Sequence, residues 1–357
     1  MPLNYNDINS KTTEYTIPRL YDLIFKASPI FTRLRTKNAM MFEGGTKIKQ
    51  PFIHDELNGG SYAPGVDFST IVAPGRTAGT GIGYVQTDTA LELFIKHYEV
   101  NVTLIGPDAV LEAGPETVMK SSTSKLINAA GTMAKLISTD FWHGASGATG
   151  DSATTAIDGF ARAINNGAAY PGSGFGHPAY TTYGGINRLT DWPVPVAAGT
   201  NNHLLNGGVF QSAAPGQITN DELQKAYGAA TSGNQQPDMI VTSQNIFNKI
   251  HGNQMGMRSY AEEDTDVAKI GFRALRYNAA SIVVDQYAPE DVAWFLNSNY
   301  MQFWTSKLPK YSFGWTGWKA APNNDNQVAQ YLWAGNILVN NPRLFSVIDA
   351  SNWAPTP

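Results

Sequence analysis

The chain has 357 residues, of which 42% are hydrophobic and only 15% are charged, and its formal net charge is −4. Soluble domains average about 25% charged residues, so a chain with so few charges is expected to bury much of its surface against partners. Its 8 tryptophans and 16 tyrosines agree with this, because both residues are favoured at interface centres. The absence of cysteine excludes disulfides, thiolate metal sites and cysteine nucleophiles.

Two further classes of protein are disfavoured by the charge and hydropathy patterns. No run of lysine and arginine is longer than two residues, which argues against a dedicated nucleic-acid-binding surface. Residues 1–9 are polar and lack the apolar centre of an export signal. No apolar run reaches the roughly 18 residues that cross a membrane. We therefore expect a protein that is made and used in a cytoplasm, away from membranes.

The first 40 residues predict an arm with short helical pieces. Leu20, Leu23 and Ile24 fall at helical spacing, and Pro29 interrupts the pattern before a second apolar group. This segment has too little apolar material to form its own core, so we expect it to lie across another surface.

Two predicted strands flank a long irregular stretch. The first strand covers Thr46 to Ile53, and residues 55–83 are rich in glycine, proline and threonine. Strict alternation of polar and apolar residues then predicts a half-buried strand from His97 to Leu104. So long a stretch without a core of its own is unusual inside a compact domain. We expect an extended hairpin that needs another surface to lie on.

A long helix is predicted after Gly114-Pro115, because proline is tolerated at a first helical position. His143-Gly144 suits its end. About 28 residues at 1.5 Å each would span roughly 42 Å. The predicted core residues of the helix step by three or four along one stripe: Leu126, Ala130, Met133, Ile137 and Phe141.

The rest of the chain predicts loops, a small α/β unit and then strands. Residues 144–217 read as loops with short strands. Thr219 to Glu222 fits a capping box at the start of a helix. Met239–Thr242 predicts a buried strand, and Ser243 is a candidate cap for the next helix. The strands predicted after Phe272 are Ser281–Asp285, Trp294–Leu296, a segment with Tyr300, Phe303 and Trp304, and Gln327–Val339.

The order of these parts resembles the major capsid proteins of tailed bacteriophages, which have the Hong Kong 97-like fold of the α+β class. The resemblance covers essentially the whole chain. The phrases that carry it are Gly114-Pro115-Glu116, Tyr183-Gly184-Gly185-Ile186-Asn187-Arg188, Pro237-Asp238-Met239-Ile240-Val241-Thr242, Trp294-Phe295-Leu296-Asn297 and Asn340-Asn341-Pro342-Arg343.

The resemblance implies a division of the chain. Residues 1–41 would be the N-terminal arm, 42–98 the extended E-loop hairpin, 99–144 the P-domain with its long spine helix, 145–290 the α/β A-domain, and 291–357 the return strands of the P-domain and the C-terminus. The E-loop would contact a neighbouring subunit through Lys47, Lys49, Phe52, Glu56, Tyr62 and Phe68.

The implied function is that of a virion structural protein, with no catalytic activity, cofactor or metal. Copies of the chain would assemble into pentamers and hexamers, and these into an icosahedral shell around double-stranded DNA, in the host cytoplasm. The implied partners are a scaffolding protein and a portal protein, with a decoration protein as a further candidate. Because the numbering begins directly at the arm, the scaffolding protein is expected to be separate, unless an N-terminal scaffolding segment was removed before the numbering begins. Packaged DNA would make only weak non-specific contact, helped by the mild negative charge.

Three alternatives stay open. An encapsulin-type compartment shell would share the fold but enclose enzymes. A tail-tube or other virion protein fits the long helix poorly. A secreted sugar-active enzyme would explain the aromatic residues, but it needs paired carboxylates in a cleft and normally an export signal.

Other motifs give weak signals for chemistry. The six histidines have no metal-ligand spacing, and the acidic run at Glu262–Asp266 lacks the spacing of a calcium loop. Residues 79–83 alternate glycine but lack the pattern of a phosphate-binding loop. Some relatives crosslink a loop lysine to a neighbour's asparagine. Here Lys47 or Lys49 and Asn323 or Asn324 would be the pair, provided that burial makes the lysine neutral.

Overall fold

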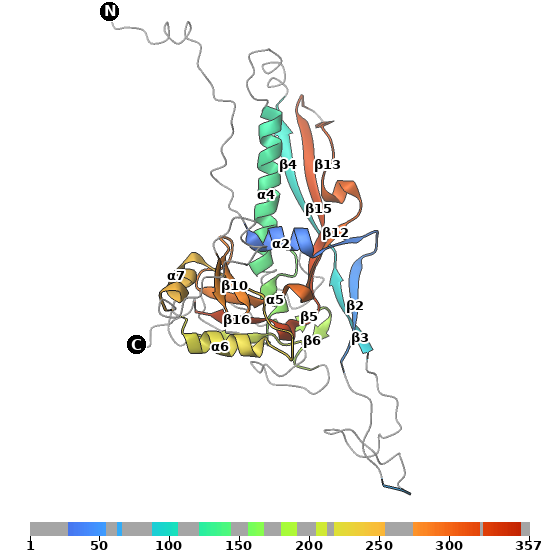
Figure 1. Ribbon diagram of the computed structural model, residues 1–357. Coiled ribbons are helices and arrows are strands. Elements are labelled where there is room, and N and C mark those ends of the chain that lie inside the picture. The colour runs from blue at the N-terminus through green and yellow to red at the C-terminus, as the bar shows by residue number, and fades with distance from the viewer. Residues whose placement is uncertain are drawn as a thin grey trace, which may run out of the picture.

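The structure is a computed structural model, and it describes residues 28–54, 63–65, 88–105, 121–143, 156–167, 180–190, 205–212, 218–253, 274–321 and 324–350. These residues form two large sheets, two small hairpins and the helices that join them (Figure 1).

The first sheet, here called the long sheet, is built around β15 (Gln327–Val339), the longest strand. Its second half is fully buried, whereas its first half is only partly covered. Strands from distant parts of the chain pair with it or with its neighbour: β4 (Lys96–Leu104), β12 (Met301–Ser306), β13 (Ser312–Trp315), β14 (Lys319–Ala320), and β1 (Ala39–Phe42), which runs parallel to β12.

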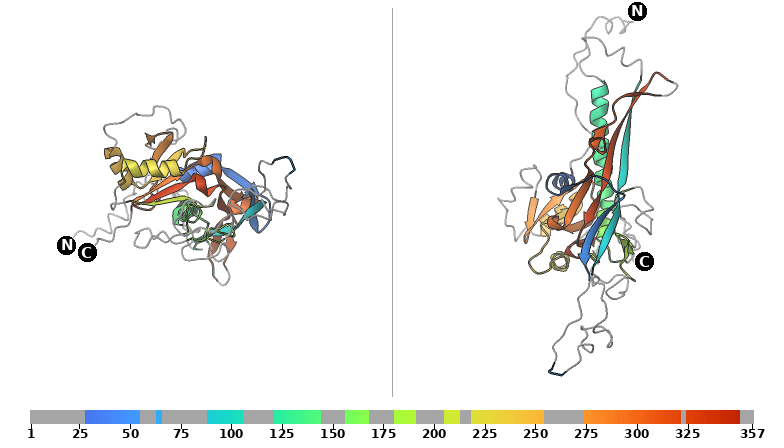
Figure 2. Two further views of the ribbon diagram at one scale, coloured as in Figure 1. Left: turned by 90° about the horizontal axis from the view of Figure 1, so that it is seen from below. Right: turned by 90° about the vertical axis from the view of Figure 1, so that its right-hand side faces the viewer.

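The second sheet, here called the α/β sheet, has central strands that are buried on both faces. Its strands, in spatial order, are β7 (Gly208–Gln211), β16 (Ser346–Asp349), β11 (Val292–Leu296), β8 (Met239–Thr242), β10 (Ala280–Val284) and β9 (Ala274–Tyr277). Helices α6 (Asn220–Ala229) and α7 (Gln244–Asn253) pack on one face through Leu223, Ile246 and Ile250 (Figure 2). The end of α4 and the short α5 (Phe160–Ala163) pack on the other. Burial on both faces explains why β8 and β11 are continuous apolar runs.

Helix α4 (Ser121–His143) lies along β4 and β15 and ends against the α/β sheet (Figure 1). At 1.5 Å per residue its 23 residues span about 35 Å. The ring of Trp142, near its end, lies 5.7 Å from that of Trp294 in the α/β sheet and 5.4 Å from that of Phe160. One hydrophobic core therefore continues from the long sheet into the α/β sheet. None of the described helices is long and apolar enough to span a membrane.

Helix α2 (Pro29–Lys37) crosses the junction between the two sheets. Pro29 begins this helix and does not interrupt one, because the side chain of Ser28 caps it by accepting a hydrogen bond from the backbone N–H of Phe31. Ile30 and Leu34 are fully buried in the common core. Residues 28–41 of the predicted arm thus lie across the junction of the two sheets of their own subunit. Residues 1–27 lie outside the described part.

Two small hairpins complete the fold. Strands β2 (Lys47–Ile53) and β3 (Asp88–Phe94) form the longer hairpin. It projects from the molecule in the direction opposite to the N-terminal end of α4 (Figures 1 and 2). Strands β5 (Thr182–Tyr183) and β6 (Ile186–Asn187) form the shorter one. Three short 3-10 turns, η2 (Ser298–Tyr300), η3 (Pro309–Tyr311) and η4 (Pro342–Leu344), connect strands.

Most elements with a local signal lie where the sequence predicts them. The alternation in β4, the capping box of Thr219 and Glu222, and the full extent of β15 are all confirmed. Ser243 precedes α7 as predicted, but its hydroxyl accepts from the backbone N–H of Asp291 and so ties the helix to the turn before β11.

The predicted division at residue 290 does not match the strand pairing. Strands β11 and β16 both lie beyond that position, yet they pair with each other and with β8 and β7 of the α/β sheet. Only β12 to β15 return to the long sheet. The reason is that β11 is apolar on both faces and therefore belongs in a sheet that is covered on both sides.

Candidate assembly site

The projecting β2–β3 hairpin is the first part of the candidate assembly site. Its strands pair in register from Lys47 opposite Phe94 to Ile53 opposite Asp88. Leu91 and Leu93 are fully buried near the base, whereas Ile53 at the other end of β2 is 76% exposed. The hairpin is therefore anchored at one end and offers apolar surface at the other. Two strands alone are marginal in water, so contact with a further surface would stabilise this end.

The lysines predicted for subunit contact share one carboxylate. The Nζ atom of Lys47 lies 2.7 Å from Oε2 of Glu92, and that of Lys49 lies 2.6 Å from Oε1. Hydrogen bonds from the two ammonium groups lower the pKa of Glu92 to about 2. Both amines are thereby engaged with a carboxylate of their own subunit. The crosslink considered from the sequence stays a prediction.

The remaining predicted contact residues are only partly described. Phe52 is half-buried and packs against the core. Glu56, Tyr62 and Phe68 lie outside the described residues, as does Asn323. The side chain of Asn324 accepts a hydrogen bond from the backbone N–H of Asn326, within its own turn. Glu262–Asp266 and residues 79–83 also lie outside the described part.

The short β5–β6 hairpin is the seat on which the projecting hairpin rests. The backbone carbonyl of Gly184 accepts a hydrogen bond of 2.9 Å from the N–H of Glu92. Gly184 has a φ of +59°, and a Cβ at this position would lie 2.7 Å from the side chain of Leu91. Only glycine fits this turn without strain, which gives a physical reason for the Tyr183–Arg188 phrase in the sequence.

Arg188 fixes that seat to the rest of the molecule. Its side chain is fully buried and donates hydrogen bonds to four backbone carbonyls at 2.8–3.0 Å, those of Tyr180, Leu205, Arg162 and Ala163. The last two lie at the end of α5, where the helix dipole favours a cation. One side chain thereby joins three segments that are far apart along the chain. No local pattern around Arg188 indicates this role, because its four acceptors lie in other segments of the chain or outside any motif.

A buried ion pair connects the same region to β15. Arg162 and Asp158 are both shielded from water, with 3.1 Å between Nη1 and Oδ1. Asn336 of β15 donates to the other oxygen of Asp158 at 2.8 Å and also to the backbone carbonyl of Phe94 at 2.8 Å. The base of the projecting hairpin, α5 and the centre of the long sheet are therefore held by one polar network.

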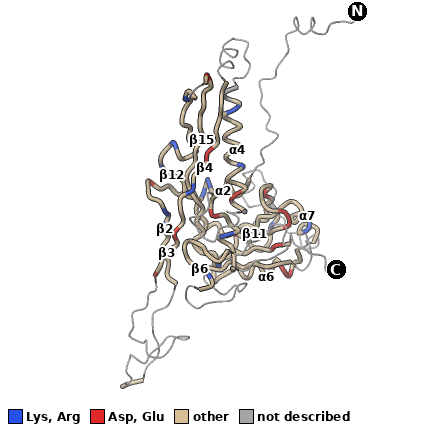
Figure 3. Tube along the Cα trace, turned by 180° about the vertical axis from the view of Figure 1, so that it is seen from behind, with Lys and Arg blue, Asp and Glu red and all other residues tan. Residues whose placement is uncertain are grey.

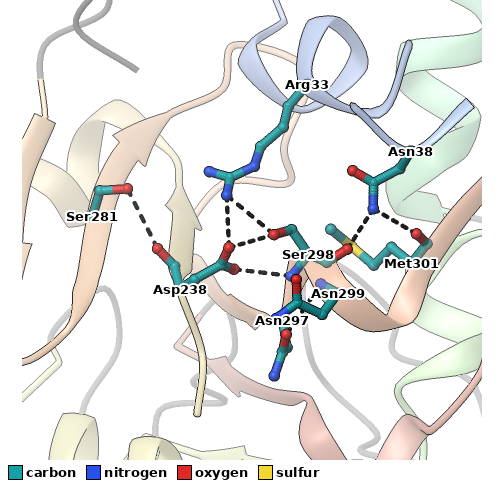
Figure 4. A network of polar contacts seen from close by, with 8 residues as sticks. All are labelled: Arg33, Asn38, Asp238, Ser281, Asn297, Ser298, Asn299 and Met301. Atoms are coloured by element: carbon teal, nitrogen blue, oxygen red, sulfur yellow. Dashed lines mark hydrogen bonds and ion pairs between the residues drawn. The ribbon is translucent and has the colours of Figure 1, made fainter. Parts of the chain in front are cut away.

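A second network fastens α2 across the two sheets (Figure 4). The guanidinium of Arg33 lies 2.6 Å from Oδ2 of Asp238, which directly precedes β8. Oδ1 of Asp238 accepts from the backbone N–H of Ser298 at 2.9 Å, and Oδ2 accepts from the Ser298 hydroxyl. After the helix, Asn38 donates to the carbonyls of Ser298 and Met301 at the start of β12. These contacts position the long sheet relative to the α/β sheet.

Asp285, just after β10, holds the other end of α2. Its Oδ2 accepts a hydrogen bond of 2.5 Å from the hydroxyl of Ser28, the residue that caps the helix. Its Oδ1 accepts from the backbone N–H of Tyr287 at 2.8 Å. Burial raises the pKa of Asp285 to about 6, and these hydrogen bonds only partly oppose the rise.

The raised pKa of Asp285 predicts a specific pH dependence. A carboxyl group with a higher pKa in the folded state stabilises the fold fully below its unfolded pKa of about 4, and this contribution is lost as pH rises through about 6. The full effect corresponds to roughly 3 kcal/mol, of which about half falls between pH 5 and pH 8. Relative to Asp285→Asn, the unchanged protein should therefore be about 1.5 kcal/mol more stable at pH 5 than at pH 8.

Denaturant unfolding of both proteins at pH 5, 6.5 and 8 measures this difference. The exposed Asp221, changed to Asn, serves as the control for a surface carboxylate. An identical free-energy difference at all three pH values would show that Asp285 does not titrate in this range.

The predicted stripe of α4 needs one correction. Met133, Ile137 and Phe141 are fully buried, and Leu126 is half-buried. Ala130 is exposed, and Ala129 is the buried residue of that turn. The buried row runs through residues 129, 133, 137 and 141 in steps of four, so it is inclined across the helix. Ala130 lies about 100° further round and faces away.

Several large apolar side chains are exposed on the isolated subunit, while charges are sparse along the trace (Figure 3). They lie at the ends of strands, on α4 and beside η3. The set is Met40, Met41, Ile53, Ile105, Ile127, Leu136 and Leu308, with exposures from 41% to 76%. Among the described residues no group of three or more histidine or acidic side chains could hold a metal ion. The exposed apolar side chains suit contact with another surface.

Comparison with solved structures shows which proteins have this fold. The capsid subunit of cyanophage A-1(L) matches with a TM-score of 0.63 over 98% of this chain and 99% of its own, at 14% sequence identity. The capsid of a native GTA particle matches with a TM-score of 0.61 over 99% and 100%, at 9% identity. The encapsulin complex of Synechococcus elongatus matches with a TM-score of 0.55 over 99% and 98%, at 9% identity.

No protein-family model and no curated protein matches the sequence. The structural matches nevertheless extend over nearly the whole of both chains. The fold is therefore that of tailed-phage capsid subunits, a mixture of helices and sheets, as the resemblance in the sequence implied.

Proposed function

We propose that the protein is the major capsid protein of a tailed bacteriophage and acts by assembly into a closed shell around double-stranded DNA. The observation that carries this proposal is the end-to-end structural match with the cyanophage and GTA capsids. The protein would therefore be structural and not an enzyme, without cofactor, and located in the virion capsid.

The exposed apolar side chains support assembly on physical grounds. Ile53 is 76% exposed and Met41 64%, and both lie on strands with free edges or ends. Contacts between different faces of identical subunits close into rings when the rotation allows it. Permanent interfaces bury about 2,000–5,000 Å². At about 25 cal/mol per Å² of apolar surface, the free energy gained by burying this area can exceed the 5–15 kcal/mol stability of a single domain.

The parts of the chain receive roles within this proposal. Residues 1–41 form the arm and 42–98 the E-loop, whose Lys47, Lys49, Phe52, Glu56, Tyr62 and Phe68 contact a neighbouring subunit. Helix α4 is the spine helix, and the α/β sheet with α6 and α7 lies around the five- and six-fold axes. The strand pairing places β11 and β16 with that α/β unit.

The finer partners belong to the proposal as well. Pentamers and hexamers of this chain would assemble in the host cytoplasm with a scaffolding protein and a portal protein. A decoration protein is a further candidate for the outer face. Packaged DNA would make only weak contact, because the chain carries a net charge of −4.

Electron microscopy of the purified protein, alone and co-expressed with a scaffolding protein, tests the function. We expect closed particles of uniform size in at least one of the two preparations. A folded monomer in every preparation, shown by analytical ultracentrifugation over a range of salt and protein concentrations, would contradict the proposal.

An encapsulin-type compartment shell is the second candidate, and the match to the Synechococcus encapsulin complex is the observation that favours it. Its TM-score of 0.55 is lower than the 0.63 of the cyanophage capsid. The contents of particles from the native source separate the two functions. Nuclease-protected DNA supports the capsid, whereas a packaged enzyme without DNA supports the compartment.

A further inference from the structure

A pocket of about 400 Å³ lies where the projecting hairpin meets the junction of the two sheets. Its apolar wall consists of Phe52 and Ile53 from β2, with Leu205 and Leu344 from the body of the subunit. Two chain crossings between the sheets contribute Asn299 and Tyr300, and Asn340, Asn341 and Arg343. These crossings are joined by a hydrogen bond of 2.9 Å from the N–H of Asn340 to the carbonyl of Tyr300. Gln50, Pro51 and Ser232 complete the lining.

Four polar side chains of this pocket, those of Asn299, Tyr300, Asn340 and Asn341, have no hydrogen-bond partner among the described residues. Gln50, which also lines the pocket, donates to the backbone carbonyl of Pro51. The Oδ1 atom of Asn340 is also shielded from water, so its hydrogen-bonding capacity is unused. Native proteins leave few buried polar groups unsatisfied, so the buried Oδ1 of Asn340 indicates a ligand that donates an N–H or O–H here, as the backbone of a bound peptide segment would.

Arg343 adds an unpaired positive charge to the same pocket. Each other arginine in the described part of the chain has a partner: an acid for Arg33 and Arg162, backbone carbonyls for Arg188 and Arg276, and an aromatic ring for Arg35. Arg343 is exposed and makes no such contact, and no acidic residue lines the pocket. A guanidinium surrounded by amide donors suits a carboxylate, which it can bind through two hydrogen bonds.

We propose that this pocket binds a carboxylate-bearing segment of a second copy of this chain, with Arg343 receiving the carboxylate. The inference rests on the proposed function, since it names a contact within the shell. The apolar wall fits the side chains beside that carboxylate. Nucleic-acid phosphate fits less well, because backbone binding uses several cations together, whereas this pocket has one cation between apolar side chains.

The chain carries unpaired carboxylates that suit the role of the group bound by Arg343. Glu99 on β4, Glu290 before β11 and Asp325 before β15 are all exposed and have no ion-pair partner. None of them lines the pocket, so any of them would reach Arg343 from another subunit. A bound segment would touch the hairpin and both sheet crossings together, and would hold the hairpin in the orientation that the shell requires.

Charge reversal at Arg343 tests the proposal under conditions where the unchanged protein forms shells. Arg343→Glu should raise the protein concentration needed for shell formation at least about tenfold, which is about 1.4 kcal/mol per contact. Arg343→Lys should have a smaller effect, because it keeps the charge but loses the paired hydrogen bonds. The matched control is Arg276→Glu, an exposed arginine on β9, which should stay within about twofold. Shell formation by Arg343→Glu at the unchanged concentration overturns the proposal.

Combined variants identify the carboxylate that binds Arg343. Arg343→Glu is paired in turn with Glu99→Arg, Glu290→Arg and Asp325→Arg, and one of the three should restore assembly. An Arg343 effect that disappears after nuclease treatment would assign the pocket to DNA phosphate and overturn the proposal. If the unchanged protein forms no shells, the proposed function fails first, and the two failures stay distinguishable.

Hydrogen exchange of the unchanged protein decides the matter if a variant fails to fold. The backbone N–H groups of Asn341 and Arg343 have no hydrogen-bond acceptor among the described residues. Both should exchange at least about tenfold more slowly in shells than in free subunits. Equal exchange in the two states overturns the proposal. Protection of these two amides in the free subunit does so as well, because the occupant would then belong to the same chain.

Discussion

Replacing Arg188 by methionine is expected to lower the free energy of unfolding of the free subunit by about 3–5 kcal/mol. The guanidinium is fully buried, and four backbone carbonyls from three chain segments accept its hydrogen bonds. Methionine fills much of the space but donates nothing, so these carbonyls lose their partner in a region without water. The seat of the projecting hairpin should loosen as a result, and shell formation should weaken together with stability.

Denaturant unfolding followed by tryptophan fluorescence measures the loss. The control is Arg276→Met on the exposed face of β9, where a change within about 0.5 kcal/mol is expected. A loss at Arg188 no larger than that of the control would mean that the carbonyls find other donors, and that the side chain does not hold the three segments together.

Elements with a local signal could be predicted from the sequence. The alternation from His97 to Leu104 gives the exposed and covered faces of β4 directly, since side chains in a strand change face at every residue. Thr219 and Glu222 mark the start of α6, because the capping box is formed within three residues. The strand from Gln327 to Val339 ends where Asn340-Asn341-Pro342 stops the pattern.

Contacts between distant residues could not be predicted in this way. Arg33 and Asp238 are 205 positions apart, and Ser28 and Asp285 are 257 apart, so nothing near either residue reveals its partner. The same limit explains why the predicted boundary at residue 290 separates β11 from the α/β sheet to which it belongs. On local evidence alone, the apolar β11 fits either sheet. Ala130 shows a finer limit. A helical period identifies the apolar side, but the neighbouring strand decides which of two adjacent alanines is covered.

The candidate site likewise has a part that could be predicted from the sequence and a part that could not. The sequence indicated that Lys47, Lys49 and Phe52 lie on a projecting hairpin, and the structure places all three on β2. The phrase Asn340-Asn341-Pro342-Arg343 contains no signal for the polar pocket beside Arg343. A cluster of asparagines beside a proline looks like an ordinary turn, and only the fold shows that these side chains lack partners and converge with Asn299 and Tyr300.

Replacing Trp142 by alanine is the second change with a large expected effect, a loss of about 3–5 kcal/mol in the free energy of unfolding. The indole is fully buried at the end of α4, between the rings of Phe160 and Trp294. It is the point at which the core of the long sheet continues into the α/β sheet. Alanine would leave a cavity there that the two sheets cannot close without moving relative to each other.

Trp142→Phe is the matched comparison, because it keeps an aromatic ring in the same place. The indole N–H of Trp142 is buried without an acceptor, and an unsatisfied buried donor costs about 1–3 kcal/mol. Phenylalanine loses some packing but removes that donor, so the two effects should nearly cancel and leave stability within about 1 kcal/mol. Denaturant unfolding of both variants gives the comparison. If phenylalanine and alanine were equally damaging, the indole N–H would have to be bonded, and the junction would depend on that bond more than on the ring.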